Sequence, residues 1–278
     1  MEQRRTLLIT GCSSGIGHHC AHGMARRGWR VFATARRPED VDRLADEGLE
    51  ALTLDLDRPE SIARAVDNVL HRTGGRLDAL FNNGAYGQPG AVEDLSRDAL
   101  RAQFETNLFG WLDLTNRVIP AMRERGHGRI VMNSSILGLV ALKWRGAYSA
   151  SKFALEGLSD TLRLELAGSG VTVSLIEPGP IESRFRQNGL AAYRRWIDPA
   201  ASVHREHYAA TERRLRRKGN PQPFTLGPEA IQRRLVHATE SRRPRTRYPV
   251  TFPTKLFAVL RRVLPTRVLD RVATAVSD

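Results

Sequence analysis

The stretch TGCSSGIG, residues 10–17, constrains the fold of this 278-residue chain more than any other feature. It directly follows TLLIT, an apolar run that predicts a short buried strand, and it opens GIGHHCAHGMARRGW, whose pattern predicts a helix ending at Gly28. Glycines let the backbone turn tightly and approach a pyrophosphate, while the helix N-terminus presents free N–H groups and a positive dipole end. In this strand–loop–helix context a glycine-rich loop indicates a dinucleotide-binding site.

Strands and helices alternate along the rest of the chain. Further strands are predicted at residues 29–35, 48–56, 77–84, 128–135 and 171–179, with helices between them. Each strand is apolar along its whole length, which is typical of a parallel sheet covered by helices on both faces. We therefore expect an α/β fold, a single Rossmann-type domain over residues 1–278 with a doubly wound parallel sheet, which binds ligands at the carboxyl ends of its strands.

The chain is strongly basic, with 43 lysines and arginines against 30 acidic residues and a formal net charge of +13. Such an excess raises the question of a nucleic-acid partner. The arginines are scattered, however, and no zinc-finger spacing or RNA-binding aromatic signature accompanies them, so we expect no nucleic-acid binding. The histidines show no ligand spacing, and we expect no metal site.

The sequence carries no feature of export or membrane insertion. The N-terminal residues have no signal-peptide pattern, and no apolar run approaches the roughly 18 residues of a membrane span. The two cysteines, Cys12 and Cys20, are expected to lie too far apart for a disulfide, which suits a reducing compartment. We therefore expect a cytoplasmic protein.

A tyrosine and a lysine stand four residues apart in GAYSASKFAL, residues 146–155. The lysine is conspicuous because only four of the 43 basic residues are lysines. On a helix, Tyr148 and Lys152 are neighbours on one face, so the ammonium is expected to lower the pKa of the phenol from about 10. The tyrosine would then serve as an acid or base near neutral pH. The alternative is a solvated helix face that carries both residues by chance.

The pattern T-G-x-x-x-G-I-G together with Y-x-x-x-K resembles the short-chain dehydrogenase/reductase family. Other segments agree: NNGA follows the fourth strand, Ser135 precedes the tyrosine by 148 − 135 = 13 residues, and EPGPI follows the sixth strand. The family usually has N-N-A-G, so Gly84 and Ala85 are transposed here, which leaves the backbone angles at this turn in question. The later segments resemble the steroid- and retinol-dehydrogenase-like branch.

The resemblance implies a catalytic set of Asn107, Ser135, Tyr148 and Lys152. Tyr148 would exchange a proton with the substrate oxygen, Ser135 would orient that oxygen, and Lys152 would hold the nicotinamide ribose. Asn107 would support a water-mediated proton path behind the lysine. Two alternatives stay open: Ser134 could replace Ser135, and Asn107 could cap or kink a helix.

The second strand ends in Ala35, Arg36 and Arg37, where an NAD site would have an acidic residue. Two guanidiniums can instead bind a 2′-phosphate, so we expect NADP(H) as the cofactor. The alternative is a pair of solvated arginines. The resemblance and the loop together imply these cofactor-binding residues: Gly11, Ser13, Ser14, Gly15, Ile16, Arg36, Arg37, Asp55, Leu56, Asn83, Gly84, Tyr148, Lys152, Pro178, Gly179 and Ile181.

Residues 183–226 depart from the sheet pattern and are expected to cover the active site as a lid, with Asp198 and Pro199 beginning a helix. Apolar side chains there and after Ser135 predict a small hydrophobic carbonyl or alcohol substrate, steroid-like, retinoid-like or long-chain. The alternative is ordinary core and loop packing. The expected substrate contacts are Ser135, Leu137, Trp144, Tyr148 and Phe185; Leu139, Val140, Leu142, Tyr193 and Trp196 could extend the apolar wall.

Residues 251–278 predict a C-terminal helical extension, two short amphipathic helices split by Pro265. They could cover the sheet edge, form a subunit interface or lie peripherally on a membrane surface with arginines toward anionic lipid. Family resemblance implies a homo-oligomer, a dimer or tetramer.

The chain is therefore expected to be an NADP(H)-dependent oxidoreductase that interconverts a carbonyl and an alcohol. Two alternatives stay open. One is a catalytically silent NADP(H)-sensing regulator. The other is a sugar-nucleotide epimerase-like enzyme, although such enzymes space their glycines as T-G-x-x-G-x-x-G.

Overall fold

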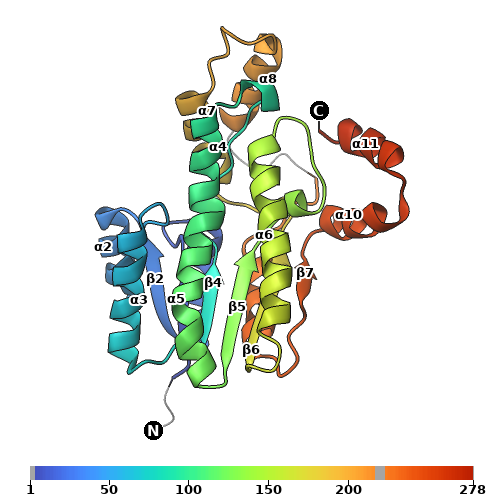
Figure 1. Ribbon diagram of the computed structural model, residues 1–278. Helices are drawn as coiled ribbons and strands as arrows, with labels where there is room; N and C mark the ends of the chain where they lie inside the picture. Colours follow the sequence, from blue (N-terminus) through green and yellow to red (C-terminus); the bar gives the residue numbers. More distant parts are fainter. Residues whose placement is uncertain (1–3, 217–222, 278) are drawn as a thin grey trace.

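The structure, a computed structural model, describes residues 4–216 and 223–277. Within them, seven parallel strands form one sheet in the order β3-β2-β1-β4-β5-β6-β7 (Figure 1). The α/β prediction is confirmed. The strands are β1 (Thr6–Ile9), β2 (Arg30–Ala35), β3 (Glu50–Thr53), β4 (Ala79–Asn82), β5 (Gly128–Asn133), β6 (Val171–Glu177) and β7 (Arg247–Pro249).

The strand order reverses at β1, which pairs with β2 on one side and with β4 on the other. In α/β folds of this kind, ligands bind at such a reversal, outside the carboxyl ends of the strands. The glycine-rich stretch follows β1, and the NNGA stretch follows β4. The fold therefore brings these two motifs to one edge of the sheet.

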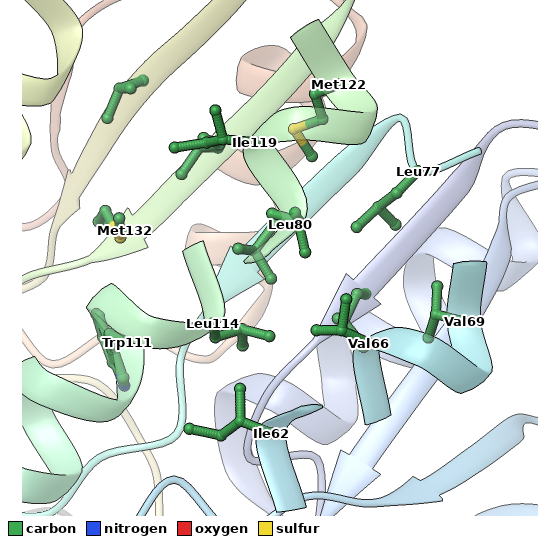
Figure 2. Packing of buried hydrophobic residues seen from close by; sticks show 14 of the residues in the cluster. Ile62, Val66, Val69, Leu77, Leu80, Trp111, Leu114, Ile119, Met122 and Met132 are labelled. Atoms are coloured by element: carbon green, nitrogen blue, oxygen red, sulfur yellow. The ribbon is translucent and has the colours of Figure 1, made fainter. Parts of the chain in front are cut away.

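One face of the sheet is covered by α3 (Pro59–Thr73), α5 (Gly110–Glu124) and α6 (Gly146–Glu165), which lie in front of the strands in Figure 1. Every second strand residue points to this face. Leu80 of β4 packs there with Ile62, Val66 and Leu114, and Trp111 belongs to the same buried cluster (Figure 2).

The opposite face is covered by α1 (Gly15–Arg26), α2 (Pro38–Asp46) and α9 (Glu229–Glu240). Its core holds the alternate strand residues Leu7 and Ile9 together with Met24, Leu44 and Leu235. Both α2 and α3 have proline at the first helical position after an extended residue, where the missing N–H costs no hydrogen bond.

The helical segment between the fourth and fifth strands, residues 97–124, is not one regular helix. It consists of α4 (Arg97–Phe104), a π-helical turn η2 (Glu105–Phe109) and α5. Ser96 caps α4 by accepting a hydrogen bond from the Ala99 N–H at 3.1 Å. The π turn places Asn107 in the protein interior, completely buried. Short 3₁₀ turns, η1 (Val92–Asp94) and η3 (Ile136–Gly138), flank the same end of the sheet.

The insertion after β6 folds as α7 (Phe185–Trp196) and α8 (Arg205–Arg216), beyond the carboxyl ends of the strands (Figure 1). Part of the predicted lid, residues 217–222, lies outside the described residues. The ends of the insertion pair with each other: the Glu182 N–H donates to the Leu226 carbonyl at 3.0 Å, and the Leu226 N–H donates to the Pro180 carbonyl at 3.2 Å.

The helix start predicted at Asp198 and Pro199 is wrong. The Asp198 carboxylate accepts a hydrogen bond from the Ala200 N–H at 3.0 Å and so closes a turn, and α8 begins later at Arg205. Tyr208 anchors α8: its hydroxyl donates to Asp94 and accepts from the Ala91 N–H at 2.9 Å. The insertion is thereby fastened to the loop around η1.

The two C-terminal helices form as predicted, α10 (Phe252–Val263) and α11 (Thr266–Ala275), with Pro265 between them. Phe257 and Ala273 pack against Val140, and the Lys143 N–H donates to the Ser277 hydroxyl at 3.1 Å. The extension therefore supports the loop between β5 and α6. Among the helices described, none is both long enough and apolar enough to cross a membrane.

Candidate active site

The glycine-rich loop turns directly from β1 into α1. Gly11 and Gly15 have φ values of +72° and +58°, which favour glycine, and a Cβ on Gly17 would lie 2.2 Å from the Gly11 carbonyl oxygen. The Thr10 hydroxyl accepts hydrogen bonds from the N–H groups of Asn83 at 2.8 Å and Gly84 at 2.9 Å. The two loops at the topological switch point are thus held together.

The N-terminus of α1 directly follows this glycine-rich loop. Ser14 precedes the helix in an extended conformation, and its side chain makes no capping hydrogen bond. Ser13, Ser14 and Ile16 are partly exposed, and the Arg43 guanidinium fixes the loop by donating to the Ser13 carbonyl at 2.7 Å. A tight glycine loop that leads into an uncapped helix N-terminus fits a dinucleotide pyrophosphate.

Gly84 is required by close packing. It has no positive φ, but a Cβ there would lie 3.2 Å from Leu56 Cδ1 and 3.3 Å from the Gly11 nitrogen. Trp111 fixes the turn, since its indole N–H donates to the Gly84 carbonyl at 2.8 Å. The transposition of Gly84 and Ala85 therefore keeps the residue without a side chain at the contact with the glycine-rich loop.

The predicted adenosine contacts lie at the ends of β2 and β3. Arg36 and Arg37 are exposed directly after β2, and Asp55 is partly exposed after β3. Leu56 is buried, touches the Gly84 turn and lines a cavity of about 350 Å³ between α3 and α5. No predicted catalytic side chain lines that cavity.

Ser135 and Tyr148 lie on either side of the loop that joins β5 to α6. Ser135 caps the short turn η3, where its hydroxyl accepts from the Leu137 N–H at 3.1 Å. Tyr148 lies in the first turn of α6 and is 9% exposed. Burial raises the pKa of Tyr148 to about 12, and hydrogen bonding to the Ser135 side chain opposes that rise.

Lys152 lies one turn further along α6 and is 1% exposed. Its ammonium donates to the Asn133 carbonyl at 2.8 Å and lies 4.2 Å from the centre of the Trp111 ring. Burial lowers the pKa of Lys152 to about 7, and the charge of Glu156 opposes that fall. The lowered tyrosine pKa expected from the sequence is not observed, because burial disfavours the charged form of both groups.

Asn107 connects the π turn to the loop after β4. Its amide donates to the Tyr86 carbonyl at 2.8 Å, its oxygen accepts from the Tyr86 N–H at 3.2 Å, and it reaches the Ser151 hydroxyl at 3.4 Å. The side chain therefore fixes another loop and does not cap its own helix. Sequence reasoning missed Tyr86, because the residue contributes only backbone groups.

The loop after β6 completes the same edge of the sheet. Pro178 is buried, and its carbonyl accepts from the Ile136 N–H at 2.7 Å, next to Ser135. A Cβ on Gly179 would lie 2.1 Å from Thr251 Oγ1, so α10 packs closely on this loop. Ile181 bridges to Leu226 at the base of the insertion.

Ser134 differs from Ser135 in its surroundings. Its hydroxyl donates to the Glu156 carboxylate, which also accepts from Arg247. Arg247 further donates to Glu177 at 2.7 Å and to Asp160. Ser134 thus belongs to a largely buried ionic cluster behind the site, whereas Ser135 is the serine beside the tyrosine.

Phe185 covers Tyr148 from the insertion. The two rings meet edge to face with 5.2 Å between their centres. Gly87 fits between them: a Cβ there would lie 2.8 Å from Phe185 Cζ and 3.5 Å from Tyr148 Cδ2. Gly87 had no signal in the sequence, since its role depends on a contact with a helix about a hundred residues later.

Several apolar residues assigned to a substrate wall pack elsewhere. Trp144 stacks on His207 with 3.7 Å between ring centres and adopts a φ of +66°. Val140 packs against the C-terminal helices, and Tyr193 lies in the core of the insertion. These contacts are those of ordinary packing, the alternative that the sequence left open, and a role of these residues in substrate binding stays a prediction. Three further residues were predicted to extend the apolar wall. Leu139 and Leu142 lie in the same loop as Val140. The Trp196 ring is covered by the Arg195 guanidinium.

Several relatives match most of the chain. The chain is 44% identical to "Uncharacterized oxidoreductase YbbO" of Escherichia coli over 97% of its own length and 94% of the relative. It is 33% identical to human 17-beta-hydroxysteroid dehydrogenase type 1 over 94% of its own length and 80% of the relative. It is 37% identical to human retinol dehydrogenase 8 over 73% of its own length and 68% of the relative.

Solved structures of the same fold contain nicotinamide cofactors. A short-chain dehydrogenase/reductase of Burkholderia phymatum in complex with NAD matches with a TM-score of 0.76, 25% identity and 92% coverage of both chains. A variant of actinorhodin polyketide ketoreductase with NADPH matches with a TM-score of 0.69 and 30% identity. The match covers 86% of this chain and 91% of the ketoreductase chain.

A family model described as short chain dehydrogenase matches residues 5–193, from the first strand into the insertion. That span contains both loops at the switch point and the helix that carries Tyr148 and Lys152. The sequence, the fold and the relatives agree, and the chain belongs to the short-chain dehydrogenase/reductase family of oxidoreductases.

Proposed function

We propose that the protein is an NADP(H)-dependent oxidoreductase that interconverts an apolar carbonyl compound and its alcohol, with Tyr148 as the acid and base. The observation that carries the proposal is the buried Tyr148 phenol, which lies beside Ser135 and under Phe185. A phenol whose pKa is about 12 is protonated at neutral pH and holds the proton that carbonyl reduction consumes.

The cofactor would lie along the carboxyl edge of the sheet. Its pyrophosphate would bind at Gly11, Ser13, Ser14, Gly15 and Ile16, its adenosine at Asp55, Leu56, Asn83 and Gly84, and its nicotinamide half near Lys152, Pro178, Gly179 and Ile181. When bound, the nicotinamide supplies or accepts the hydride. The exposed Arg36 and Arg37 support NADP(H), because no carboxylate stands at this position to repel a 2′-phosphate.

The chain's own residues divide the remaining work. Tyr148 donates its proton to the substrate oxygen in reduction and removes one in oxidation, while Ser135 orients that oxygen. Lys152, with its pKa near 7, exchanges protons readily at neutral pH and holds the ribose. Asn107 supports the proton path behind it through its contact with Ser151.

The substrate is proposed to be hydrophobic. Leu137 lies next to Ser135, and Phe185 lies against Tyr148. Trp144 joins the same loop to α8 by stacking on His207. Relatives named for hydroxysteroids and retinol point the same way. We further propose a cytoplasmic homo-oligomer in which the insertion serves as the lid of a single-domain enzyme.

Replacement of Tyr148 tests the proposed reaction. Tyr148→Phe removes only the hydroxyl, so turnover of retinal, keto-steroids and aliphatic aldehydes with NADPH should fall by at least about 100-fold. Cofactor affinity, measured by NADPH fluorescence titration, should persist. Tyr193→Phe removes a hydroxyl from the core of the insertion and should keep activity. NADPH binding by the wild type without turnover of any carbonyl would favour a sensing regulator.

Arg36→Asp tests the cofactor. The change removes one charge-assisted contact and adds repulsion of a 2′-phosphate, so kcat/KM for NADPH should fall by about 10- to 100-fold. The value for NADH should fall much less. Arg26→Asp, an equal charge change on an exposed residue at the far end of α1, should alter neither value. Preference of the wild type for NADH would exclude the NADP(H) assignment.

A further inference from the structure

Two histidines and a glutamate meet on the sheet face opposite α6. His18 and His22 lie one turn apart on α1, and Glu47 follows the last turn of α2. The Nε2 atoms of both imidazoles lie 2.7 Å from the same carboxylate oxygen, Glu47 Oε2. The ring centres are 4.6 Å apart.

The convergence brings three possible metal ligands together on the surface. Both imidazole rings are directed at one carboxylate oxygen, and all three side chains remain in partial contact with water. One potential ligand atom from each residue lies within 4.8 Å of the other two. Nowhere else in residues 4–216 and 223–277 does such a group of three histidine, cysteine or acidic side chains occur.

We propose that His18, His22 and Glu47 bind a divalent transition-metal ion such as Zn²⁺, with water completing the coordination. The expectation of no metal site overlooked the spacing of His18 and His22. Two histidines four residues apart on a helix present their ring nitrogens to one side, and a carboxylate from a second element supplies the third ligand. Two nitrogens and one oxygen suit Zn²⁺, Ni²⁺ or Cu²⁺, whereas Mg²⁺ and Ca²⁺ require mostly oxygen ligands.

The neighbouring charges define the mode of binding. Arg43 Nε lies 3.7 Å from Glu47 Oε1, the other carboxylate oxygen, and Arg43 is also paired with Asp40 at 2.9 Å. The ion would therefore bind through Oε2, and the guanidinium would weaken binding by repulsion. All three ligand side chains are partly exposed, so an ion can enter from solvent.

Occupation of this site would link α1 to the end of α2. Ion binding to the folded state stabilises it by mass action. The site is independent of Tyr148 and of the proposed reaction, so its test does not depend on turnover.

The test uses full-length protein without a histidine tag, after treatment with a chelator. Titration calorimetry with ZnCl₂ and NiCl₂ should detect one site, and MgCl₂ should give no signal. With Zn²⁺ at about a hundredfold excess over its Kd, the Tm should rise by about 5 °C. His18→Ala and His22→Ala should each lower the affinity for Zn²⁺ by at least about tenfold. Removal of a residue that only hydrogen-bonds a metal ligand already costs about that much, and these variants remove a ligand itself.

Two further variants separate metal binding from simple hydrogen bonding. Glu47→Gln keeps a hydrogen-bond acceptor but removes the anionic ligand, so it should weaken Zn²⁺ binding while the metal-free Tm stays close to that of the wild type. His19→Ala, on the same helix but outside the cluster, should bind Zn²⁺ as the wild type does. Absence of binding in the wild type, or equal binding by all four variants, would overturn the proposal.

Discussion

Tyr148 and Lys152 occupy successive turns of α6 with almost no exposure to solvent. The tyrosine pKa rises to about 12 and the lysine pKa falls to about 7, so Tyr148 is uncharged at neutral pH and Lys152 loses its charge as the pH rises above about 7. A surface pair of the same spacing would behave in the opposite way, with the ammonium stabilising a phenolate. Burial by Trp111, Phe185 and the surrounding loops thus sets the acid–base behaviour of the two residues.

The lysine makes the stability of the protein depend on pH. Between the folded pKa of about 7 and the unfolded value of 10.5, the unfolded state binds a proton at Lys152 that the folded state does not. The free energy of unfolding should therefore rise with pH by up to about 1.4 kcal/mol per pH unit in this window. Lys152→Met should lack that increment, as measured by urea unfolding at about pH 7 and about pH 9.

Lys255→Met serves as the control, because Lys255 is exposed in α10 and its removal should leave the pH dependence of the wild type intact. Parallel pH profiles for the wild type and Lys152→Met would contradict the buried, neutral lysine.

At the scale of elements, α7 is positioned by close packing on the loop after β4. Phe185 meets Gly87, and Gly189, one turn on, would place a Cβ 3.4 Å from the Gly87 carbonyl oxygen. The first contact leaves no room for a methyl group, and the second is an ordinary van der Waals distance. The ring over Tyr148 therefore depends on the absence of a side chain at Gly87.

Gly87→Ala should displace Phe185 and with it the start of α7. We expect KM for an apolar substrate to rise by about 10- to 200-fold, since removal of one methylene-sized contact costs about 1–3 kcal/mol. Steady-state kinetics with NADPH at saturation measure the change. Gly189→Ala adds the same methyl group on the α7 side of this contact, where it causes no clash, and it should leave KM unaltered. Equal effects of both variants would show that Phe185 does not set substrate binding.

Much of this element structure could be predicted, because the first six strands are mainly apolar or buried and each is followed by a helical pattern. Strand β7 was missed, since Arg247–Pro249 has only three residues and just Tyr248 is buried. The π turn was missed because one extra residue per turn barely changes the hydrophobic period. The stacking of Trp144 on His207 could not be predicted, because His207 lies in a distant helix.

For the whole molecule, the outer surfaces of α5 and α6 expose large apolar side chains. Phe109, at the end of the π turn, is 49% exposed, and Leu158 is 40% exposed. Apolar groups on adjoining helices of a water-facing surface are typical of a site that another protein covers. We expect this surface to join copies of the chain.

Leu158→Arg should convert the oligomer to monomers, because an interface of this kind cannot bury an unpaired guanidinium. Analytical ultracentrifugation measures the change, and the monomer should keep its far-ultraviolet circular dichroism. Val203→Arg introduces the same charge at an 83% exposed position in the insertion and should leave the assembly intact. An unchanged sedimentation coefficient for Leu158→Arg would place the interface elsewhere or show that the chain is monomeric.

The paired ends of the insertion also bear on how such a protein can diversify. Backbone hydrogen bonds join the two ends of the insertion, between Leu226 on one side and Pro180 and Glu182 on the other. These bonds involve no side chain of the segment between them. Because closing a loop costs only about 0.6 kcal/mol more for each doubling of its length, the segment between them can be lengthened or replaced at little expense to the sheet. The part of the segment beyond Phe185 can thus change, and with it the proposed lid and its substrate preference, while Phe185 and the loops that follow β1 and β4 stay in place.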